Sequence, residues 1–393
     1  MTDVAERYLT LGLRLGRHVD GLVDAYYGPP GLAQAVDAEQ PLDPPDLVAE
    51  ADALAADVES ADLEAQRKGW LADQVQGLRV YAGVLAGEAR SYADEVEGCY
   101  GVRPEKGSED TYREAHEHLD ELLPGRGPLR ERYEQWRSDH AVPSDRMVPA
   151  LIALAEVLRT RTSRLIELPA GEALVIDEVH DEPWWAFNYF LGDLRSRVVM
   201  NVDMLTTASD LVMLAGHEAY PGHHTEHAVK EQHLIRDGGQ LEEAIQLVPT
   251  PQAVVSEGIA EIGLGIVLDA ELEHELDAAL VAQGLDADLG RALAIGRARR
   301  PLRKIGLDAA LIVHEDGAPA DEARAHVERW GLGTAEQAAH TVRFVTDPTW
   351  RAYAITYSAG QDLCSAYVAD DPARFLSLLT GQVRVSDLLA AHA

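Results

Sequence analysis

Residues 211–224 read Leu-Val-Met-Leu-Ala-Gly-His-Glu-Ala-Tyr-Pro-Gly-His-His, an apolar run followed by a glutamate and three histidines. The run at 211–215 predicts a buried helix that begins near Asp210, with Thr206 or Ser209 as its N-cap. That helix would carry the first histidine in its later turns and end where proline and glycine follow. Neutral imidazole is the commonest protein ligand of zinc. The stretch therefore predicts a helical fold built around a metal site.

The spacing of these histidines differs from the common zinc-hydrolase pattern, in which two histidines lie four residues apart on one helix face. The fourth position after His217 is Pro221, which cannot bind a metal, and His223 and His224 follow it. On an unbroken helix, a residue seven positions on lies about 10 Å along the axis, too far to share one ion comfortably. A kink or π-type bulge at 221–222 could bring His223 beside His217. The turn could instead present His224, so both are candidate ligands, with His223 preferred.

A third ligand must come from elsewhere, because a catalytic zinc usually has three protein ligands and one open position. Glu257 is the best candidate, since a carboxylate flanked by glycine and apolar residues must be paired or bind a metal. Glu261 lies four residues later, on the same face of a helix, and could orient a histidine. The alternative is an ordinary exposed pair on an amphipathic helix. Glu218, beside the first ligand, is the predicted general base.

The rest of the chain reads as mostly helical, with apolar residues at three- and four-residue spacing between proline- and glycine-rich breaks. The clearest helical segments are 47–65, 70–97, 109–123 and 148–166. We predict a helical region at 1–170 and a region carrying the site at 171–393. The two regions are expected to form one continuous unit.

A small sheet is expected just before the histidines. Segments 173–176 and 197–202 are rich in β-branched residues, and 186–191 could be a third strand. The predicted fold class is therefore mostly α, with a small antiparallel or mixed sheet beside the active-site helix. The edge of such a sheet can hold an extended peptide, although a purely structural hairpin is an equal alternative.

Composition narrows the class of partner. The 393 residues include 34 Lys plus Arg against 67 Asp plus Glu, a formal charge of −33. This balance argues against nucleic acid and anionic membranes, because phosphate binding needs clustered cations. No run approaches the roughly twenty apolar residues that span a bilayer, and we expect no secretory signal. Two cysteines, Cys99 and Cys364, do not make a disulfide framework. We expect a cytoplasmic protein with a small peptide as substrate, and a homodimer is neither required nor excluded.

The pattern His-Glu-x-x-Pro-Gly-His-His at 217–224, followed by a Glu-Gly helix at 257–258, resembles the bacterial DUF885 family. Segments 314–330, 342–348 and 355–360 are similar to C-terminal segments of that family, so the resemblance covers roughly residues 174–370. The family is similar to the M32 carboxypeptidases and related mostly helical gluzincins. The resemblance implies a deep cleft between helices, a small sheet lining it, and a glutamate as third zinc ligand.

The resemblance also gives Tyr357 a role as hydrogen-bond donor to the oxyanion that forms during hydrolysis. Tyr353, one turn earlier, is the second choice, and core packing is the preferred explanation for it. An enzyme that removes C-terminal residues needs a cation for the substrate carboxylate, and arginine is the best suited. Arg343 and Arg351 are the candidates for substrate binding.

Together these observations predict a zinc-dependent metallopeptidase with one zinc ion. A carboxypeptidase that acts on short peptides is the more specific form of this prediction. Zinc-dependent cleavage of an amide or ester in a small metabolite is the near alternative. A metal-binding or degenerate helical protein without catalysis is the other, because Pro221 stands where a second ligand usually lies.

Overall fold

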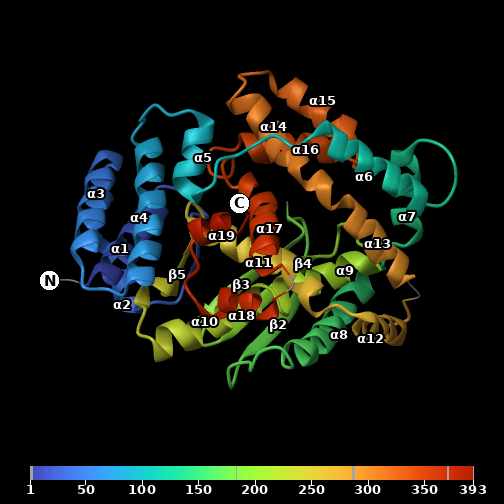
Figure 1. Ribbon diagram of the computed structural model, residues 1–393, viewed down its shortest axis with the longest axis horizontal. Helices are drawn as coiled ribbons and strands as arrows, with labels where there is room; N and C mark the ends of the chain where they lie inside the picture. Colours follow the sequence, from blue (N-terminus) through green and yellow to red (C-terminus); the bar gives the residue numbers. More distant parts are fainter. Residues whose placement is uncertain (1–2, 183, 286–287, 370, 393) are drawn as a thin grey trace.

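The computed structural model describes residues 3–182, 184–285, 288–369 and 371–392, which form a mostly helical molecule with two small sheets (Figure 1). This confirms the predicted fold class. The α-helices are α1 (Val4–Gly16), α2 (Pro30–Ala38), α3 (Pro44–Ser60), α4 (Ala65–Leu85), α5 (Tyr92–Tyr100), α6 (Glu109–Leu122), α7 (Leu129–Asp139), α8 (Ser144–Thr162), α9 (Ala208–Leu214), α10 (His223–Lys230), α11 (Pro251–Val267), α12 (Ala270–Ala282), α13 (Leu289–Arg299), α14 (Lys304–His314), α15 (Ala320–Trp330), α16 (Ala335–Thr346), α17 (Ala354–Val368), α18 (Pro372–Thr380) and α19 (Val385–His392). Short π and 3₁₀ segments are η1 (Ala215–Ala219), η2 (Glu231–Asp237), η3 (Leu241–Ala244) and η4 (Arg300–Arg303).

Two of the predicted helices were wrong in extent, because inside each predicted segment a capping side chain begins a new helix. Segment 47–65 crosses the break between α3 and α4, where the Glu64 side chain accepts hydrogen bonds from the first amides of α4. Segment 70–97 crosses the break before α5, where Ser91 caps the new helix. Such caps satisfy amides that have no partner inside the helix.

The predicted sheet is present and mixed, with strands β2 (Ala173–Val179), β3 (Ala186–Gly192) and β4 (Arg195–Asn201). Its order is β2-β4-β3, with β2 parallel and β3 antiparallel to β4. β3 is therefore an edge strand. A second sheet was not predicted: β1 (Val23–Tyr26) pairs antiparallel with β5 (Ile245–Leu247). This pairing carries an N-terminal segment to the middle of the molecule.

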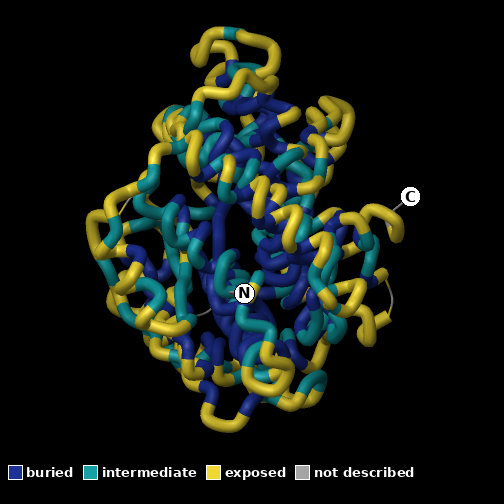
Figure 2. The backbone as a smooth tube through the Cα atoms, turned by 90° about the vertical axis from the view of Figure 1, so that its left-hand side faces the viewer, coloured by how far each residue is buried: buried dark blue, intermediate teal, exposed yellow. Residues whose placement is uncertain are grey.

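Two large apolar cores hold the molecule together. The first joins α1, α3, α4 and α5 to α11 and to the C-terminal helices, and the second joins α8, α9 and α12 to β4. Figure 2 shows the buried backbone running through the interior, with the exposed segments around it. Each core therefore draws residues from both 1–170 and 171–393.

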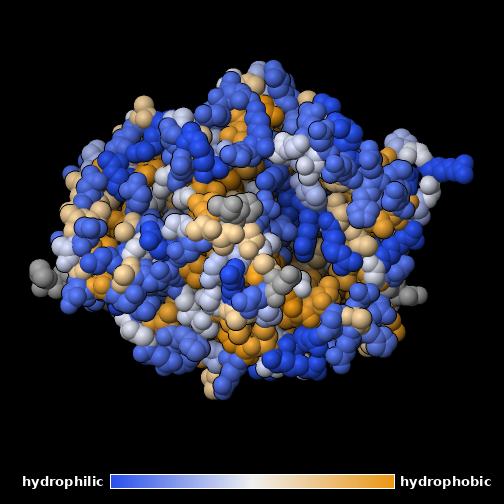
Figure 3. Space-filling model, viewed as in Figure 1, coloured by the Kyte–Doolittle hydropathy of each residue, from blue (hydrophilic) through white to orange (hydrophobic). Residues whose placement is uncertain are grey.

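Hydrophilic residues cover most of the face seen in Figure 3, as the charge of −33 leads one to expect. Cys99 and Cys364 are both buried and free. Among the described helices, none combines the length and the apolar character that crossing a bilayer requires.

Helices α11 and α17 touch at two glycines near the centre of the molecule. A Cβ atom at Gly258 would overlap the Gly360 carbonyl and the Cys364 sulfur, and one at Gly360 would overlap the Val254 carbonyl. The absence of both side chains lets the two backbones meet. This contact places Glu257 of α11 against the tyrosines at the start of α17.

Candidate metal centre

The N-cap of the histidine helix lies between the two predicted caps, one residue after Thr206 and two before Ser209. Thr207 is the N-cap of α9, and it forms a capping box with Asp210 through hydrogen bonds of 3.3 and 2.9 Å. The predictions of Thr206 and Ser209 were therefore wrong. Thr206 lies one residue before the cap, so its hydroxyl does not bond to the helix amides. It instead accepts a hydrogen bond of 3.1 Å from the Trp185 indole.

The chain widens into the π-helical segment η1 directly after α9, then becomes extended at Tyr220 and starts α10 at His223. A π-type distortion is thus present, but at Ala215–Ala219 rather than at the predicted 221–222, where the helix is interrupted. Gly222 makes the tight return, since a Cβ atom there would overlap the carbonyl oxygens of Gly216 and His217. As a result the rings of His217 and His223 lie edge to face, with centroids 4.7 Å apart.

Replacing Gly222 by alanine should lower the free energy of unfolding by about 2–3 kcal/mol, because the backbone must move to relieve the overlap. Urea denaturation would measure this change. The matched control is Gly31→Ala, at a helical position where a Cβ atom would meet nothing within 4 Å, and it should leave stability equal or slightly higher. Equal stabilities for the two variants would contradict the role given to Gly222.

Three side chains converge at this turn. The His217 Nε2 atom lies 3.6 Å from Glu257 Oε2, the His223 Nε2 atom lies 3.9 Å from Glu257 Oε1, and the ligand atoms of the group all lie within 4.8 Å of one another. Ligand atoms around tetrahedral zinc lie roughly 3.3 Å apart, given bonds of about 2.0–2.1 Å. Glu257 Oε2 is buried and has no hydrogen-bond partner among the described residues. The donor set therefore fits a cation, which would satisfy that oxygen.

A second group of possible ligands, His223, Glu226 and His227, is less suited to an ion. The Glu226 carboxylate already accepts hydrogen bonds from Lys230 (2.7 Å) and from Ser256 (2.6 Å). The His227 ring stacks on His223 with centroids 5.9 Å apart. Because Glu226 has its partners, the group with Glu257 is the better candidate.

The structure removes His224 from the predicted ligands. Its Nδ1 atom lies 2.8 Å from the Ser196 hydroxyl, and its Nε2 atom lies 2.8 Å from the Glu172 carboxylate, so both ring nitrogens are occupied. Burial raises the pKa of Glu172, but hydrogen bonds from His224 and Tyr220 outweigh it and hold that pKa at about 2. The prediction was wrong because a buried carboxylate takes this imidazole as its partner.

Two further carboxylates flank His217. Glu218 Oε1 lies 3.9 Å from its Nε2 atom, and burial raises the pKa of Glu218 to about 7. Glu261 Oε1 lies 3.6 Å from Nδ1, the other ring nitrogen, and its second oxygen pairs with Arg303. Glu261 thus lies where a group orienting the imidazole would be needed. On the sheet side, Asn188 of β3 donates a hydrogen bond of 2.6 Å to the Glu218 carbonyl.

The predicted tyrosines occupy different positions. Tyr353 donates a hydrogen bond of 2.7 Å to Glu257 Oε1, so it supports the ligand group rather than filling the core alone. Tyr357 is 38% exposed, and its side chain lines the cavities on both sides of His217. Both tyrosines line the central cleft, but Tyr357 is the more exposed, and the Tyr353 hydroxyl is already bound to Glu257.

The two candidate arginines also differ. Arg343 is exposed and lines the cleft described below. Arg351 does not line it, and its guanidinium pairs with Glu95, a carboxylate that is 4% exposed. The substrate-binding prediction for Arg351 was therefore wrong, because a buried acid needs that cation.

A central cleft of about 640 Å³ opens over His217, His223 and Glu257. One of its acidic residues, Asp24 of β1, was missed by the sequence analysis. Burial raises the pKa of Asp24 to about 6, although His223 lowers it. The alternation Val23-Asp24-Ala25-Tyr26 is the local signal for a strand, but nothing local indicates that this strand reaches the cleft.

A side cavity of about 620 Å³ lies across His217 and Glu218 from the central cleft. Both spaces are lined by His217, Glu218, Tyr357, Trp184 and Ala186, so they meet at the candidate metal centre. The edge strand β3 contributes Ala186, Phe187 and Asn188 to the central cleft.

Comparison with known proteins identifies a fold but no function. No family model and no curated protein matches the chain, so the resemblance to DUF885 stays a prediction. The crystal structure of a protein described as a "putative lipoprotein" from Colwellia psychrerythraea is similar, with a TM-score of 0.52 and 15% identity. The match covers 88% of this chain and 66% of that one, less than two thirds of its length. A "putative lipoprotein of unknown function" from Shewanella oneidensis matches at 13% identity over 91% of this chain and 75% of that one, with a TM-score of 0.39.

Proposed function

We propose that this protein is a zinc-dependent hydrolase that cleaves peptide bonds in short peptides. The observation that carries the proposal is the convergence of the His217 and His223 Nε2 atoms on Glu257, which has an unpartnered buried oxygen. These three residues would hold the ion. A bound zinc ion would act as a Lewis acid and polarise the scissile carbonyl.

The chain's own groups supply the proton transfers. Glu218 lines the central cleft beside His217, so its carboxylate can take a proton from the attacking water and return it to the leaving amine. The Tyr357 hydroxyl, open to the same space, can donate a hydrogen bond to the oxyanion. Glu261 acts through His217, whose ring it orients from the Nδ1 side.

A peptide fits the cleft better than a compact metabolite because an open sheet edge forms part of the wall. β3 pairs only with β4 in its sheet, and its first residues line the central cleft. An extended substrate can add to that edge through backbone hydrogen bonds. We assign Arg343, which forms no ion pair among the described residues, to the carboxylate of a short peptide.

A cytoplasmic location is part of this proposal. The Colwellia protein is described as a putative lipoprotein. Cell fractionation of the native host, followed by detection of this chain in the cytoplasmic or the membrane fraction, would test the cytoplasmic location.

Metal removal tests the function directly. The purified chain should contain one zinc ion per molecule, hydrolyse short peptides, lose that activity after dialysis against a chelator, and regain it when zinc is added. Elemental analysis would measure the zinc content, and chromatography of the cleaved peptides would measure the hydrolysis. Zinc binding with ester or amide cleavage but no peptide cleavage would point to a metabolite hydrolase. Zinc binding without any hydrolysis would point to a non-catalytic metal protein.

A further inference from the structure

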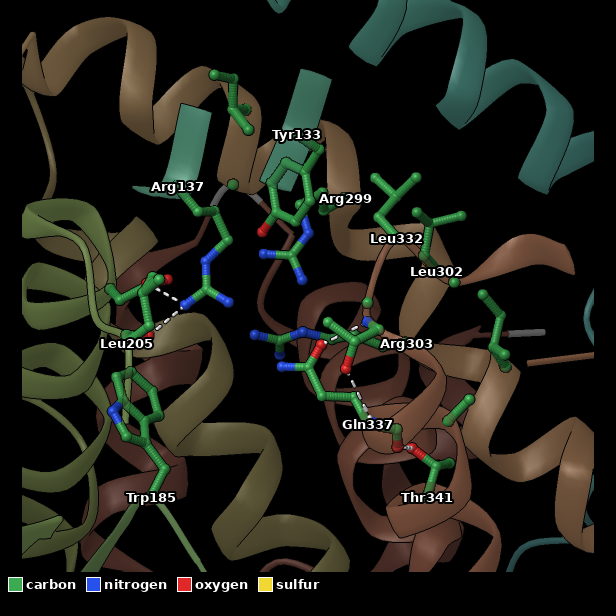
Figure 4. A pocket seen from close by; sticks show the side chains of 18 of the residues that line it. Tyr133, Arg137, Trp185, Leu205, Arg299, Leu302, Arg303, Leu332, Gln337 and Thr341 are labelled. Carbon is green, nitrogen blue, oxygen red and sulfur yellow. Dashed lines mark hydrogen bonds and ion pairs between the residues drawn. The ribbon is translucent and has the colours of Figure 1, made fainter. Parts of the chain in front are cut away.

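A third cavity, of about 720 Å³, lies between α7, α9, α13, η4 and α16 (Figure 4). None of the candidate zinc ligands lines it. It shares Trp185, Met213, Gly296 and Arg303 with the side cavity, so it is a neighbour of the metal centre and separate from it. Its volume is in the range of pockets that hold small organic molecules, about 300–1,000 Å³. We call it the arginine cavity.

Three guanidinium groups from three different elements point into the arginine cavity. Figure 4 shows Arg137 of α7, Arg299 of α13 and Arg303 of η4 converging on one region, with the carboxamide of Gln337 beside them. All these nitrogen groups are hydrogen-bond donors. The convergence therefore forms a donor-rich centre.

The positive charge of this centre is only partly balanced. Asp210 is the one carboxylate among the described lining residues. It accepts a hydrogen bond from the Thr207 amide in the capping box of α9 and lies 3.2 Å from Arg137. Arg303 pairs with Glu261, which lines the side cavity. Arg299 forms no ion pair within the described part of the chain, and its guanidinium lies 4.7 Å from the centre of the Tyr133 ring.

This imbalance is unusual in a chain with 67 acidic and 34 basic residues. Cations gathered in one cavity repel one another, and the repulsion is stronger where water is partly excluded. The Arg137 Nε atom is also buried without a hydrogen-bond partner among the described residues. Arg137 already donates to the Leu205 carbonyl and to Asp210, and Arg303 pairs with Glu261. An anion at the centre would relieve the repulsion and give Arg299 and the Arg137 Nε atom an acceptor.

The walls around the donors are aromatic and apolar. The lining includes the aromatic residues Tyr133, Trp136 and Trp185 and the apolar residues Leu302 and Leu332. Figure 4 shows Tyr133 and Trp185 at different ends of the cavity, with Leu302 and Leu332 along another side. Such walls favour an uncharged body attached to the anion, because they gain from burial of apolar surface.

The number and directions of the guanidinium groups select the kind of anion. A carboxylate has two oxygens and is matched by a single guanidinium fork. A phosphate monoester has three terminal oxygens and close to two negative charges, so it can use donors from three sides. We propose that the arginine cavity binds a small phosphate monoester, with its phosphoryl group among Arg137, Arg299 and Arg303 and its aromatic or apolar body against the walls. None of the candidate zinc ligands belongs to this site, but Arg303 links it to the metal centre through Glu261.

Phenyl phosphate is a suitable probe, and isothermal titration of the full chain, freed of metal by dialysis, would measure its binding. We expect one site per chain. Arg299→Gln should weaken binding by at least about tenfold, and Arg299→Lys, which keeps the charge but loses the fork, should weaken it less. The matched control is Arg291→Gln, an exposed arginine on the same helix outside the cavity, which should bind as the unmodified chain does.

Several results would overturn the proposal. Equal affinity of the Arg299→Gln variant and the unmodified chain would place the probe elsewhere, as would a soaked crystal with the phosphorus atom away from the three arginines. Binding of phenylacetate as tight as that of phenyl phosphate would contradict the phosphoryl assignment. Equal binding of inorganic phosphate would contradict the role of the walls. Circular dichroism of each variant would establish that it is folded, and the crystal result does not depend on any variant.

Discussion

Glu218→Gln should lower kcat for peptide hydrolysis by about a thousandfold and leave zinc bound. The carboxylate lies 3.9 Å from His217 Nε2 and lines the central cleft, where it is placed to take the proton of the attacking water. Glutamine has nearly the same shape but cannot accept that proton, and general acid–base catalysis contributes about 10²–10⁴-fold. Steady-state kinetics with a short peptide, together with elemental analysis, would measure both quantities.

The control for this variant is Glu178→Gln, which removes one negative charge from an exposed position on β2. It should retain both activity and zinc. Undiminished turnover by Glu218→Gln would remove the proposed base. Loss of zinc from Glu218→Gln would show instead that this carboxylate belongs to the ligand group.

Glu257→Gln should weaken zinc binding by about 100-fold or more. Mutation of a residue that holds a metal ligand in place commonly lowers metal affinity by about 10–100-fold. Mutation of a ligand itself should lower the affinity by at least the upper end of that range. The matched comparison is Glu261→Gln, because the Glu261 carboxylate faces the other ring nitrogen of His217. This variant should weaken zinc binding by about tenfold. Competition with a chromogenic zinc chelator would give both dissociation constants.

Stability of the metal-free protein separates a ligand role for Glu257 from a structural one. Burial raises its pKa, so the charged form is costly there, and Oε2 has no partner among the described residues. Metal-free Glu257→Gln should therefore unfold at the same urea concentration as metal-free unmodified protein, or at a higher one. Marked destabilisation without zinc would mean that the charged Glu257 carboxylate, beside His217 and His223, stabilises the fold itself, since glutamine can still accept the hydrogen bond from Tyr353.

The sequence was sufficient to predict those parts of the site whose structure depends on residues close together in the chain. The apolar run 211–215 and the pair Pro221 and Gly222 predicted a helix, a break and a return, and α9, η1 and α10 follow that plan. The three-stranded sheet was predicted because β-branched residues cluster in short runs. In each case the deciding interactions join residues close together in the chain.

Contacts between distant segments could not be predicted in this way. Asp24 reaches the cleft only because β1 pairs with β5. His224 and Arg351 were assigned to ligand and substrate, but Glu172 and Glu95 take them as partners. A single sequence does not indicate which acids become buried, and each buried acid requires a cation or a donor.

The glycine contact between α11 and α17 has a mechanical consequence. With backbone against backbone at Gly258 and Gly360, the two helices have no room to slide past each other, so Glu257, Tyr353 and Tyr357 shift as a single block. Opening of the cleft to admit a substrate would then fall to its other lining segments. These include α16, which carries Arg343, and β3, whose Asn188 side chain donates a hydrogen bond to the Glu218 carbonyl, and their movement would set how wide a molecule can enter.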